Sequence, residues 1–535
     1  MISIQDRVID DVFQEAVTRW PDQDFLVSLS TGERPMRSLT YAEVAQEVEK
    51  YVKALSRAGY GAGQRVAVLV GTCPEHYILK LAVNRLSMSF VPVNPDYRPA
   101  ELAYLLEDSD AVLAISCAPY AELMLAGIES AKATPVFAAF ETMLNTLPRA
   151  SRSPQGDNEG SSGEASLLYT SGTTGKPKGC ILSHEYELMV GASYPRLGSP
   201  VLLSENDRVF NPLPAFHINA GVVGFLGAML VGAAHMQPKR FSAKTWWQDI
   251  EESGATIFHY LGVVISVLLA DRAAGPEVLG DLRVGLGAGV EPALHVEFEK
   301  RFGIPLVEVW GMTEMCRVIS MEDEPRMIET RAFGRAYDGC EVQVWDDQGQ
   351  DVPRGTPGEM VLRHSEETPR KGFFSGYLNK IEATADAWEG GWFHTGDTVV
   401  MDEDGILFFV DRKKNIIRRA GENIAAAEIE NVLFEDDRVV NVACVAVPDE
   451  VREEEVLAAI VLADGVMPSE ETALNIFHQA YEKMAYYKPP GWVLFVDSLP
   501  VTGTQKVVKH QIFEPYEDPR ERDGIFDFRA LKKRG

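Results

Sequence analysis

The chain reads Tyr169-Thr170-Ser171-Gly172-Thr173-Thr174-Gly175-Lys176-Pro177-Lys178-Gly179, beginning with the last residue of the apolar run 165–169. That run has the length and composition of a buried strand, and the hydroxyls begin where it ends. Glycines let a backbone turn and approach an anion closely, hydroxyls donate hydrogen bonds, and lysines supply positive charge. The segment therefore predicts a loop that binds the phosphates of a nucleotide.

The glycine spacing in this run excludes the best-known phosphate loop. No glycine lies five residues before a Gly-Lys-Ser or Gly-Lys-Thr triplet, so P-loop NTPases and ordinary kinases are disfavoured. An ordinary surface turn would also be rich in serine, threonine and glycine. Such turns seldom combine three glycines, four hydroxyls and a Lys-Pro-Lys sequence, and we therefore favour phosphate binding.

The composition limits the classes of protein to which the chain can belong. With 535 residues, 46% of them hydrophobic, the chain can form several cores, and we expect more than one domain. The formal net charge of -28 argues against a nucleic-acid or anionic-membrane partner, so an anionic substrate needs a locally basic site. The six cysteines lack CxxC spacing, which predicts reduced thiols in a cytoplasmic protein without structural zinc.

The sequence predicts no membrane insertion. Residues 1–20 lack the basic start and the apolar core of a signal peptide. The uncharged, apolar segment 220–234 is short for a membrane span and contains several glycines. We therefore expect this segment to be a buried helix that packs closely on a sheet.

Strand-like and helix-like stretches alternate through the first part of the chain. Three apolar runs predict strands and two longer stretches predict helices, namely 65–70, 89–93, 111–116, 41–58 and 99–107. This alternation is typical of a parallel α/β sheet. The polar, glycine- and serine-rich stretch 149–164 predicts a linker loop ahead of the phosphate loop.

Five later segments carry residue types suited to nucleotide chemistry: Gly287-Ala288-Gly289, Trp310-Gly311-Met312-Thr313-Glu314, 391–397, 411–424 and 499–509. An aromatic ring beside a glycine can flank an adenine, a threonine hydroxyl can bond a phosphate oxygen, and a glutamate can hold Mg²⁺. A carboxylate such as Asp397 can accept hydrogen bonds from both hydroxyls of a ribose. Each segment alone has an ordinary alternative, such as a helix cap, a turn or a solvated charge run.

Together these segments resemble the signatures of the adenylate-forming superfamily, which comprises acyl-CoA ligases, adenylation domains of peptide synthetases and beetle luciferases. The resemblance runs from about Leu167 to Lys509, and the stretches 214–218 and 410–424 are most similar to the crotonobetaine and carnitine CoA ligase branch. It implies an α/β fold with a large N-terminal domain of α/β subdomains, residues 1–411, which binds ATP and the acyl group. A small, mobile α+β lid domain, residues 412–535, follows with its hinge at Lys414.

The resemblance also implies a role for each matched residue. The residues expected to bind ATP or CoA are Thr170, Ser171, Gly172, Thr173, Thr174, Gly175, Lys176, Lys178, Gly287, Ala288, Gly289, Trp310, Gly311, Met312, Asp397, Arg412, Lys414 and Gly421. The expected catalytic residues are Thr313, Glu314, His217 and Lys506, and Glu314 is also the expected Mg²⁺ ligand. Lys506 would neutralise charge between the attacking carboxylate and the α-phosphate. His217 would face the acyl pocket or the thiol path, and Gly421 would line the thiol tunnel.

Three positions depart from the usual residues of the family. Trp310 stands where tyrosine is more usual, and Ala420 stands where many relatives carry a second glycine. Gln505 replaces a glycine before the catalytic lysine, which removes a residue able to adopt positive φ. The effects of Ala420 on the tunnel and of Gln505 on the loop are left open by the sequence.

The resemblance implies an AMP-forming acyl-CoA ligase that uses ATP, Mg²⁺ and coenzyme A. Its carboxylic acid substrate is expected to be small, medium-chain or carnitine-like, and the lid domain is expected to rotate about Lys414 between the two half-reactions. Two alternatives stay open: a stand-alone enzyme that loads a carrier protein, and a non-catalytic sensor of adenylates or CoA. A homo-oligomer also stays open.

Overall fold

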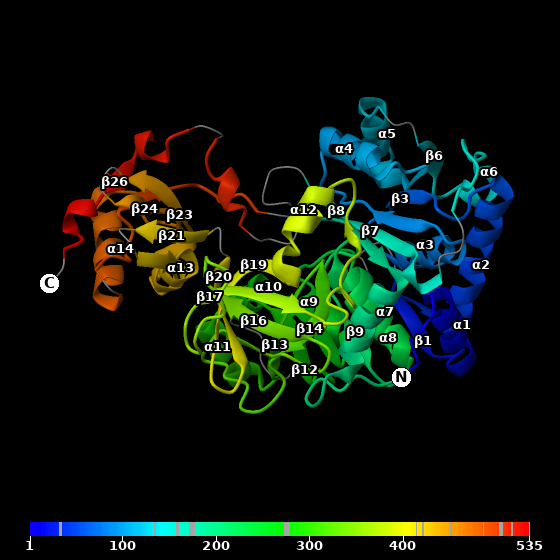
Figure 1. The fold of residues 1–535 in the computed structure, drawn as a ribbon, viewed down its shortest axis with the longest axis horizontal. Coiled ribbons are helices and arrows are strands. Elements are labelled where there is room, and N and C mark those ends of the chain that lie inside the picture. Colours follow the sequence, from blue (N-terminus) through cyan, green and yellow to red (C-terminus); the bar gives the residue numbers. More distant parts are fainter. Residues whose placement is uncertain are drawn as a thin grey trace. The chain divides into compact units, whose positions relative to one another are not determined.

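The computed structural model describes residues 1–30, 35–132, 135–156, 160–170, 177–271, 279–412, 415–419, 422–449, 452–484, 486–501, 507–514 and 517–533 (Figure 1). The chain forms two compact units. The first comprises Met1–Glu341 and Arg363–Phe393, and the second comprises Val342–Leu362 and His394–Gly535. The α/β fold class expected from the sequence is confirmed, whereas the domain boundary between residues 411 and 412 stays a prediction.

One sheet of the first unit carries the predicted phosphate loop. Its strand order is β18-β8-β7-β4-β3-β5-β6. The strands are β3 (Arg65–Leu69), β4 (Ser89–Pro92), β5 (Leu113–Ser116), β6 (Val136–Ala139), β7 (Glu164–Thr170), β8 (Lys178–Ser183) and β18 (Gly376–Tyr377). Strands β3 to β7 are parallel, and β8 pairs antiparallel with both β7 and β18. The parallel α/β pattern of the sequence is therefore confirmed here.

A second sheet of the same unit has the order β14-β13-β12-β11-β9-β10-β1-β2. Its strands are β1 (Asp24–Ser28), β2 (Arg37–Thr40), β9 (Arg208–Phe210), β10 (Ala234–Gln237), β11 (Ile257–Leu261), β12 (Val284–Ala288), β13 (Leu306–Met312) and β14 (Met315–Ser320). The uncharged segment 220–234 is helical only as far as Val231, because Gly232 adopts φ 87° and the chain then enters β10. The prediction of one helix over this segment was therefore too long.

Twelve α-helices are described in the first unit. They are α1 (Ile9–Arg19), α2 (Tyr41–Ala58), α3 (Pro74–Arg85), α4 (Pro99–Ser109), α5 (Ala121–Ser130), α6 (Met143–Thr146), α7 (His184–Ser193), α8 (Phe225–Val231), α9 (Trp246–Ser253), α10 (Gly262–Ala270), α11 (Pro292–Phe302) and α12 (Ile381–Asp386). Helix α2 shows the local rules. The Thr40 hydroxyl accepts from the Glu43 N–H, the Glu43 carboxylate accepts from the Thr40 N–H, and Gly59 ends the helix in the left-handed conformation.

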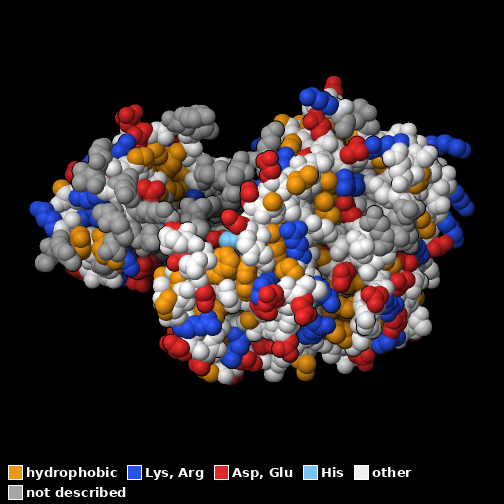
Figure 2. All heavy atoms as spheres, viewed as in Figure 1, with side chains coloured by type: hydrophobic (Ala, Val, Ile, Leu, Met, Phe, Trp, Pro, Cys, Tyr) orange, Lys and Arg blue, Asp and Glu red, His pale blue; other side chains and the backbone are white. Residues whose placement is uncertain are grey.

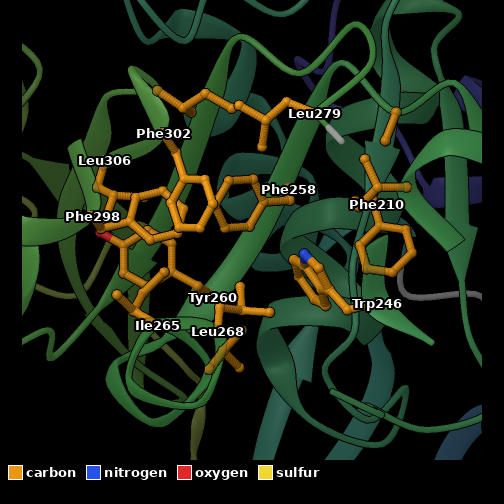
Figure 3. Close-up of a cluster of buried hydrophobic side chains, with 14 of the residues drawn as sticks. Phe210, Trp246, Phe258, Tyr260, Ile265, Leu268, Leu279, Phe298, Phe302 and Leu306 are labelled. Atoms are coloured by element: carbon orange, nitrogen blue, oxygen red, sulfur yellow. The ribbon is translucent and has the colours of Figure 1, made fainter. Parts of the chain in front are cut away.

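An aromatic core packs beside the strands that carry the candidate site. Figure 3 shows Phe210, Trp246, Phe258 and Tyr260 among the buried side chains of this core. The Phe210 and Trp246 rings meet edge to face with centroids 5.0 Å apart. Tyr260 is fully buried, but its hydroxyl donates to Glu308 Oε1 at 2.6 Å. The core therefore fixes a polar group on β13, Glu308.

The second unit contains a sheet with the order β22-β21-β24-β25-β26, in which β23 also pairs with β24. Its elements are β16 (Glu341–Trp345), β17 (Gly358–Arg363), β19 (Phe393–Met401), β20 (Ile406–Arg412), β21 (Ile416–Arg419), β22 (Glu422–Ala425), α13 (Ala426–Phe434), β23 (Val439–Asp449), β24 (Glu453–Leu462), α14 (Glu470–Lys483), β25 (Trp492–Phe495) and β26 (Ile525–Asp527). Apolar residues of α13 and α14 pack against those of β23 and β24 in one core. A second cluster joins Leu499 and Ile512 to other residues of β23 and β24.

Charged side chains of both signs are interspersed over the face of the molecule in Figure 2. Opposite charges also pair at the surface, as in Arg37 and Glu75 at 2.8 Å. Within the described ranges, no helix is both long and apolar enough to cross a bilayer.

Candidate active site

The ends of β7 and β8 define the base of the predicted phosphate loop. Thr170 and Lys178 stand opposite each other in the antiparallel pair. The connecting residues Ser171, Gly172, Thr173, Thr174, Gly175 and Lys176 lie outside the described residues. At Gly179, an added Cβ would lie only 3.0 Å from Leu167 Cδ1 and 3.1 Å from Tyr169 Cζ, so close packing explains the glycine. Thr170 is thus the last residue of β7 and Lys178 the first residue of β8 in one antiparallel pair.

A second hairpin presents the Thr313-Glu314 pair. Met312 of β13 pairs with Met315 of β14, so the two residues between them form the turn of the hairpin. The Tyr186 hydroxyl donates to the Thr313 carbonyl at 2.8 Å and accepts from the Cys316 N–H at 2.9 Å. A single buried phenol therefore fixes both sides of the turn.

Tyr377 brings the two hairpins together. Its hydroxyl donates to Glu314 Oε1 at 2.7 Å, and Lys178 Nζ lies 4.7 Å from the centroid of its ring. The Phe374 N–H donates to the Glu314 carbonyl at 2.9 Å, and Glu314 is only 6% exposed. Burial, together with the nearby Glu314 charge, raises the pKa of Tyr377 well above its usual value, so the phenol stays a hydrogen-bond donor. Lys178 and Glu314 thus meet at one tyrosine.

The small-residue turn after β12 is held by Glu308. Gly287 lies between β11 and β13, where an added Cβ would come within 2.2 Å of the Tyr260 carbonyl oxygen. The Gly289 N–H donates to Glu308 Oε2 at 2.8 Å, and nothing would lie within 4 Å of a Cβ at Gly289. Burial raises the pKa of Glu308 to about 7, although hydrogen bonds from Tyr260 and Gly289 favour its charged form. A flat ring could lie beside this open glycine.

Trp310, Gly311 and Ala288 are near these two turns in the chain. Trp310 is buried with its ring 6.4 Å from that of Phe333, whereas Gly311 is exposed. Ala288 ends β12 and is partly exposed. The aromatic, glycine and alanine positions expected to flank adenine thus lie on β12 and β13, two neighbouring strands.

His217 lies in a segment supported by a buried polar network. Its side chain is half-buried, and its ring centroid is 4.5 Å from that of Phe216. Two residues further on, Asn219 Oδ1 lies 2.7 Å from His259 Nδ1 and accepts from Asn211 Nδ2 at 2.9 Å. Burial lowers the pKa of His259 to about 3, so this histidine stays neutral. His259 is fully buried and acts as a support for the segment.

Asp397 and Arg412 belong to the second unit. They stand opposite each other on β19 and β20, and Asp397 is buried. The Asp397 N–H donates to Thr395 Oγ1 at 3.1 Å, and that hydroxyl donates to the Met360 carbonyl at 2.7 Å. The two residues predicted to bind ribose are therefore adjacent in one sheet.

The remaining predicted site residues, Lys414, Gly421 and Lys506, lie outside the described residues, as do Ala420 and Gln505. Their neighbours are described: Val501 pairs with Val507, and the Val508 N–H donates to the Pro500 carbonyl at 2.8 Å. The roles of all the predicted site residues stay predictions.

The carboxylate of Glu314 is the candidate group for Mg²⁺. Within the described residues, no three side chains of His, Cys, Asp or Glu come together as a metal cage. Mg²⁺ commonly needs only one or two carboxylates beside substrate phosphates, and one Glu314 oxygen already accepts from Tyr377. A single carboxylate at the edge of a phosphate site fits that requirement.

The sequence did not single out Tyr377, Tyr186 or Glu308. Tyr377 lies on a strand of two residues, which is too short for a periodic signal. Tyr186 lies on α7, nearly all of which is buried, so apolar spacing does not distinguish it. Glu308 could have been suspected as a charged residue in the strand-like run before Trp310.

The chain belongs to the AMP-binding enzyme family, whose profile matches residues 13–378. The profile of the AMP-binding enzyme C-terminal domain matches residues 428–506. This membership confirms the resemblance inferred from the sequence motifs.

Among curated proteins, the chain is similar to a crotonobetaine/carnitine--CoA ligase of Proteus mirabilis. The two are 29% identical over 507 residues, which cover 92% of this chain and 96% of the relative. Two solved structures share the fold. ATP-bound MatB from Rhodopseudomonas palustris has a TM-score of 0.80 at 24% identity and covers 94% of this chain and 97% of its own. The o-succinylbenzoate CoA synthetase of Bacillus subtilis, in complex with its acyl-adenylate, has a TM-score of 0.81 at 23% identity, with 95% and 98% covered.

Proposed function

We propose that the protein is an ATP-dependent, AMP-forming ligase that activates a carboxylic acid and transfers its acyl group to coenzyme A. The observation that carries the proposal is the meeting of Lys178 and Glu314 at Tyr377. A cation from the phosphate-loop hairpin and a carboxylate from a second hairpin suit the phosphates of ATP and their Mg²⁺. Membership of the AMP-binding family and the CoA ligases among its relatives support the same reaction.

In the first half-reaction, a carboxylate oxygen of the acid bonds to the α-phosphorus of ATP, and pyrophosphate leaves with the electron pair of the broken P–O bond. Thr170 and Lys178 bind phosphate oxygens, and Lys506 neutralises the charge that builds up between acid and α-phosphate. Mg²⁺ bound at Glu314 would neutralise charge on the phosphates. Asp397 and Arg412 hold the ribose.

In the second half-reaction, the sulfur of CoA bonds to the acyl carbon, AMP leaves, and the thiol proton passes to solvent. Gly421 lines the path of the thiol, His217 faces the acyl pocket, and a rotation about Lys414 exchanges Lys506 for Gly421. The acid is small, medium-chain or carnitine-like, which the named activity of the Proteus mirabilis relative supports.

The test is pyrophosphate release from Mg-ATP across a panel of short, medium, aromatic and betaine acids, with and without CoA. We expect release that depends on one class of acid, and an acyl-CoA product when CoA is present. Acid-dependent release that never consumes CoA would instead indicate a carrier protein as acceptor. Nucleotide binding without release across the panel would indicate a sensor.

A further inference from the structure

The second unit holds two segments to which the proposed function assigns different half-reactions. The first, here called the thioester hairpin, comprises β21 and β22. Arg419 pairs with Glu422, so Ala420 and Gly421 are the residues between the two strands. The second, here called the lysine segment, spans residues 499–512 and contains Lys506 between the paired residues Val501 and Val507.

A buried ionic network anchors the thioester hairpin. The Glu455 carboxylate, on β24, accepts from Arg419 Nε at 2.7 Å through one oxygen and from Lys532 Nζ through the other. The side chains of Arg419, Glu455 and Lys532 are only 4%, 0% and 0% exposed. A buried charge is stable only where a partner of opposite charge compensates for its lost hydration. Removing one member of the network leaves the remaining charges uncompensated, and their side chains are then expected to move.

Contacts of the segment around β26 position Lys532 in this network. Strand β26 pairs with β25, and Arg529 bonds to Asp449 at 2.9 Å while its guanidinium lies 4.3 Å from the Trp492 ring centroid. The Glu455 side chain packs directly against Gly491. A Cβ added at residue 491 would lie only 2.5 Å from Glu455 Cγ, so a larger residue there would displace Glu455. Arg419, which directly precedes residues 420–421, thus belongs to a network drawn from three segments distant in sequence.

A different ion pair anchors the lysine segment. Lys509 Nζ lies 2.8 Å from Glu430 Oε1 on α13, and the same carboxylate oxygen accepts from the Cys444 N–H at 2.6 Å. Leu499 and Ile512 fix the ends of the segment in the apolar cluster against β23 and β24. The two anchors have no residue in common, although they belong to one unit.

We propose that Arg419, Glu455 and Lys532 are positioning residues for acyl transfer to CoA, and that Lys509 and Glu430 position the lysine segment for adenylation. The inference rests on the proposed function, because that function assigns the thioester hairpin and the lysine segment to different steps. A general loss of stability in the unit would slow both half-reactions alike. Loss of one anchor slows one of them, and this separation is what distinguishes positioning from support of the fold.

Two assays on the full-length protein measure the half-reactions separately. Adenylation is followed as acid-dependent exchange of labelled pyrophosphate into ATP without CoA, using the acid that gives the most release in the panel above. Transfer is followed by mixing CoA with enzyme that already holds the acyl-adenylate, in a single turnover. Thermal unfolding of every variant shows that it is folded at the assay temperature.

Opposite effects are expected from the two anchors. Arg419→Lys and Glu455→Gln should slow transfer about 30-fold and change adenylation less than about threefold, because a displacement of about 1 Å can cost a hundredfold in rate. Lys532→Met leaves the Arg419–Glu455 pair and should slow transfer by about fivefold. Lys509→Met should slow adenylation and spare transfer. Arg520→Gln, which removes an ion pair with Asp518 in the same terminal segment, is the matched control and should change neither step.

Equal losses in both half-reactions for folded Arg419→Lys and Glu455→Gln would overturn the inference, as would unchanged transfer. Backbone hydrogen exchange gives a readout that needs no activity. Glu455→Gln should speed exchange at residues 416–425 and leave residues 507–514 unchanged, and the reverse pattern would contradict the network as an anchor. Failure of the unaltered protein to release pyrophosphate with any acid would count against the proposed function, whereas the exchange result would still report on the anchor.

Discussion

The turn that carries Glu314 is held differently from the thioester hairpin and the lysine segment of the second unit. Glu314 is enclosed, because its carboxylate accepts from Tyr377 and its carbonyl accepts from Phe374. The thioester hairpin is held at the strands on either side of residues 420–421, and the lysine segment at the pair of Val501 and Val507 on either side of residues 502–506. Groups that bind one nucleotide throughout a reaction can be built into a core. Groups that serve a single step are better carried on separate segments, so that one segment can replace another at the site as the reaction proceeds.

The largest effect should come from the lysine segment. Lys506→Ala removes the charge proposed to lie between the acid and the α-phosphate, and adenylation should fall about a thousandfold. The measurement is pyrophosphate exchange. The same variant should transfer an acyl group from supplied acyl-adenylate to CoA within about tenfold of the unaltered rate. An equal loss in both steps would remove the distinction between the two kinds of turn.

The enclosed carboxylate should matter next. Glu314→Gln keeps an oxygen for the Tyr377 hydroxyl but loses the charge, so adenylation should fall about a hundredfold and need more Mg²⁺. The measurement is pyrophosphate exchange as a function of Mg²⁺ concentration. Tyr377→Phe is the matched variant, and loss of its one hydrogen bond should cost only about tenfold. A larger effect from Tyr377→Phe than from Glu314→Gln would contradict the proposed role of the carboxylate.

The strands beneath the site should resist added volume. Gly287→Ala places a Cβ only 2.2 Å from the Tyr260 carbonyl oxygen. It should lower the free energy of unfolding by about 3 kcal/mol. At Gly198 the same change meets only Glu322 Oε1, at 3.9 Å, and should cost less than about 1 kcal/mol. Denaturant unfolding compares the two variants, and equal costs would show that the strand packing around Gly287 is loose.

The smallest effect concerns Glu308, whose pKa burial raises from 4.5 to about 7. Between those two values the folded protein holds a proton that the unfolded chain releases, so stability falls as the pH rises through this window. The free energy of unfolding should fall by about 2 kcal/mol across this window. This is less than the full pKa shift would give, because the Glu308 side chain is partly exposed to solvent. Glu308→Gln should flatten this slope in unfolding experiments at pH 4.5 to 7.5. A slope that the substitution leaves unchanged would assign the pH dependence to other groups.

Much of the first unit could be predicted from the sequence because its elements have clear local signals. Helix α2 begins and ends as its apolar spacing indicates, and the strand before the phosphate loop is β7. The segment 220–234 was harder, because apolar residues throughout give no period by which to place the end of a helix at Gly232.

The candidate site shows the same division. Motifs identified Lys178 and Glu314 because each lies in a recognisable run of residues. The contact that joins them depends on Tyr377 and on the pairing of β18 with β8, which no local pattern in the sequence encodes. The network of Arg419, Glu455 and Lys532 was likewise beyond prediction, because its members come from three separate segments.

The most direct test of the account is the release of pyrophosphate from Mg-ATP by the unaltered protein, followed for each acid in the panel with and without CoA. The account predicts release that requires an acid, and acyl-CoA formed in equal amount with AMP once CoA is added. Release of inorganic phosphate with formation of ADP, or tight binding of ATP without any acid-dependent turnover, would contradict it.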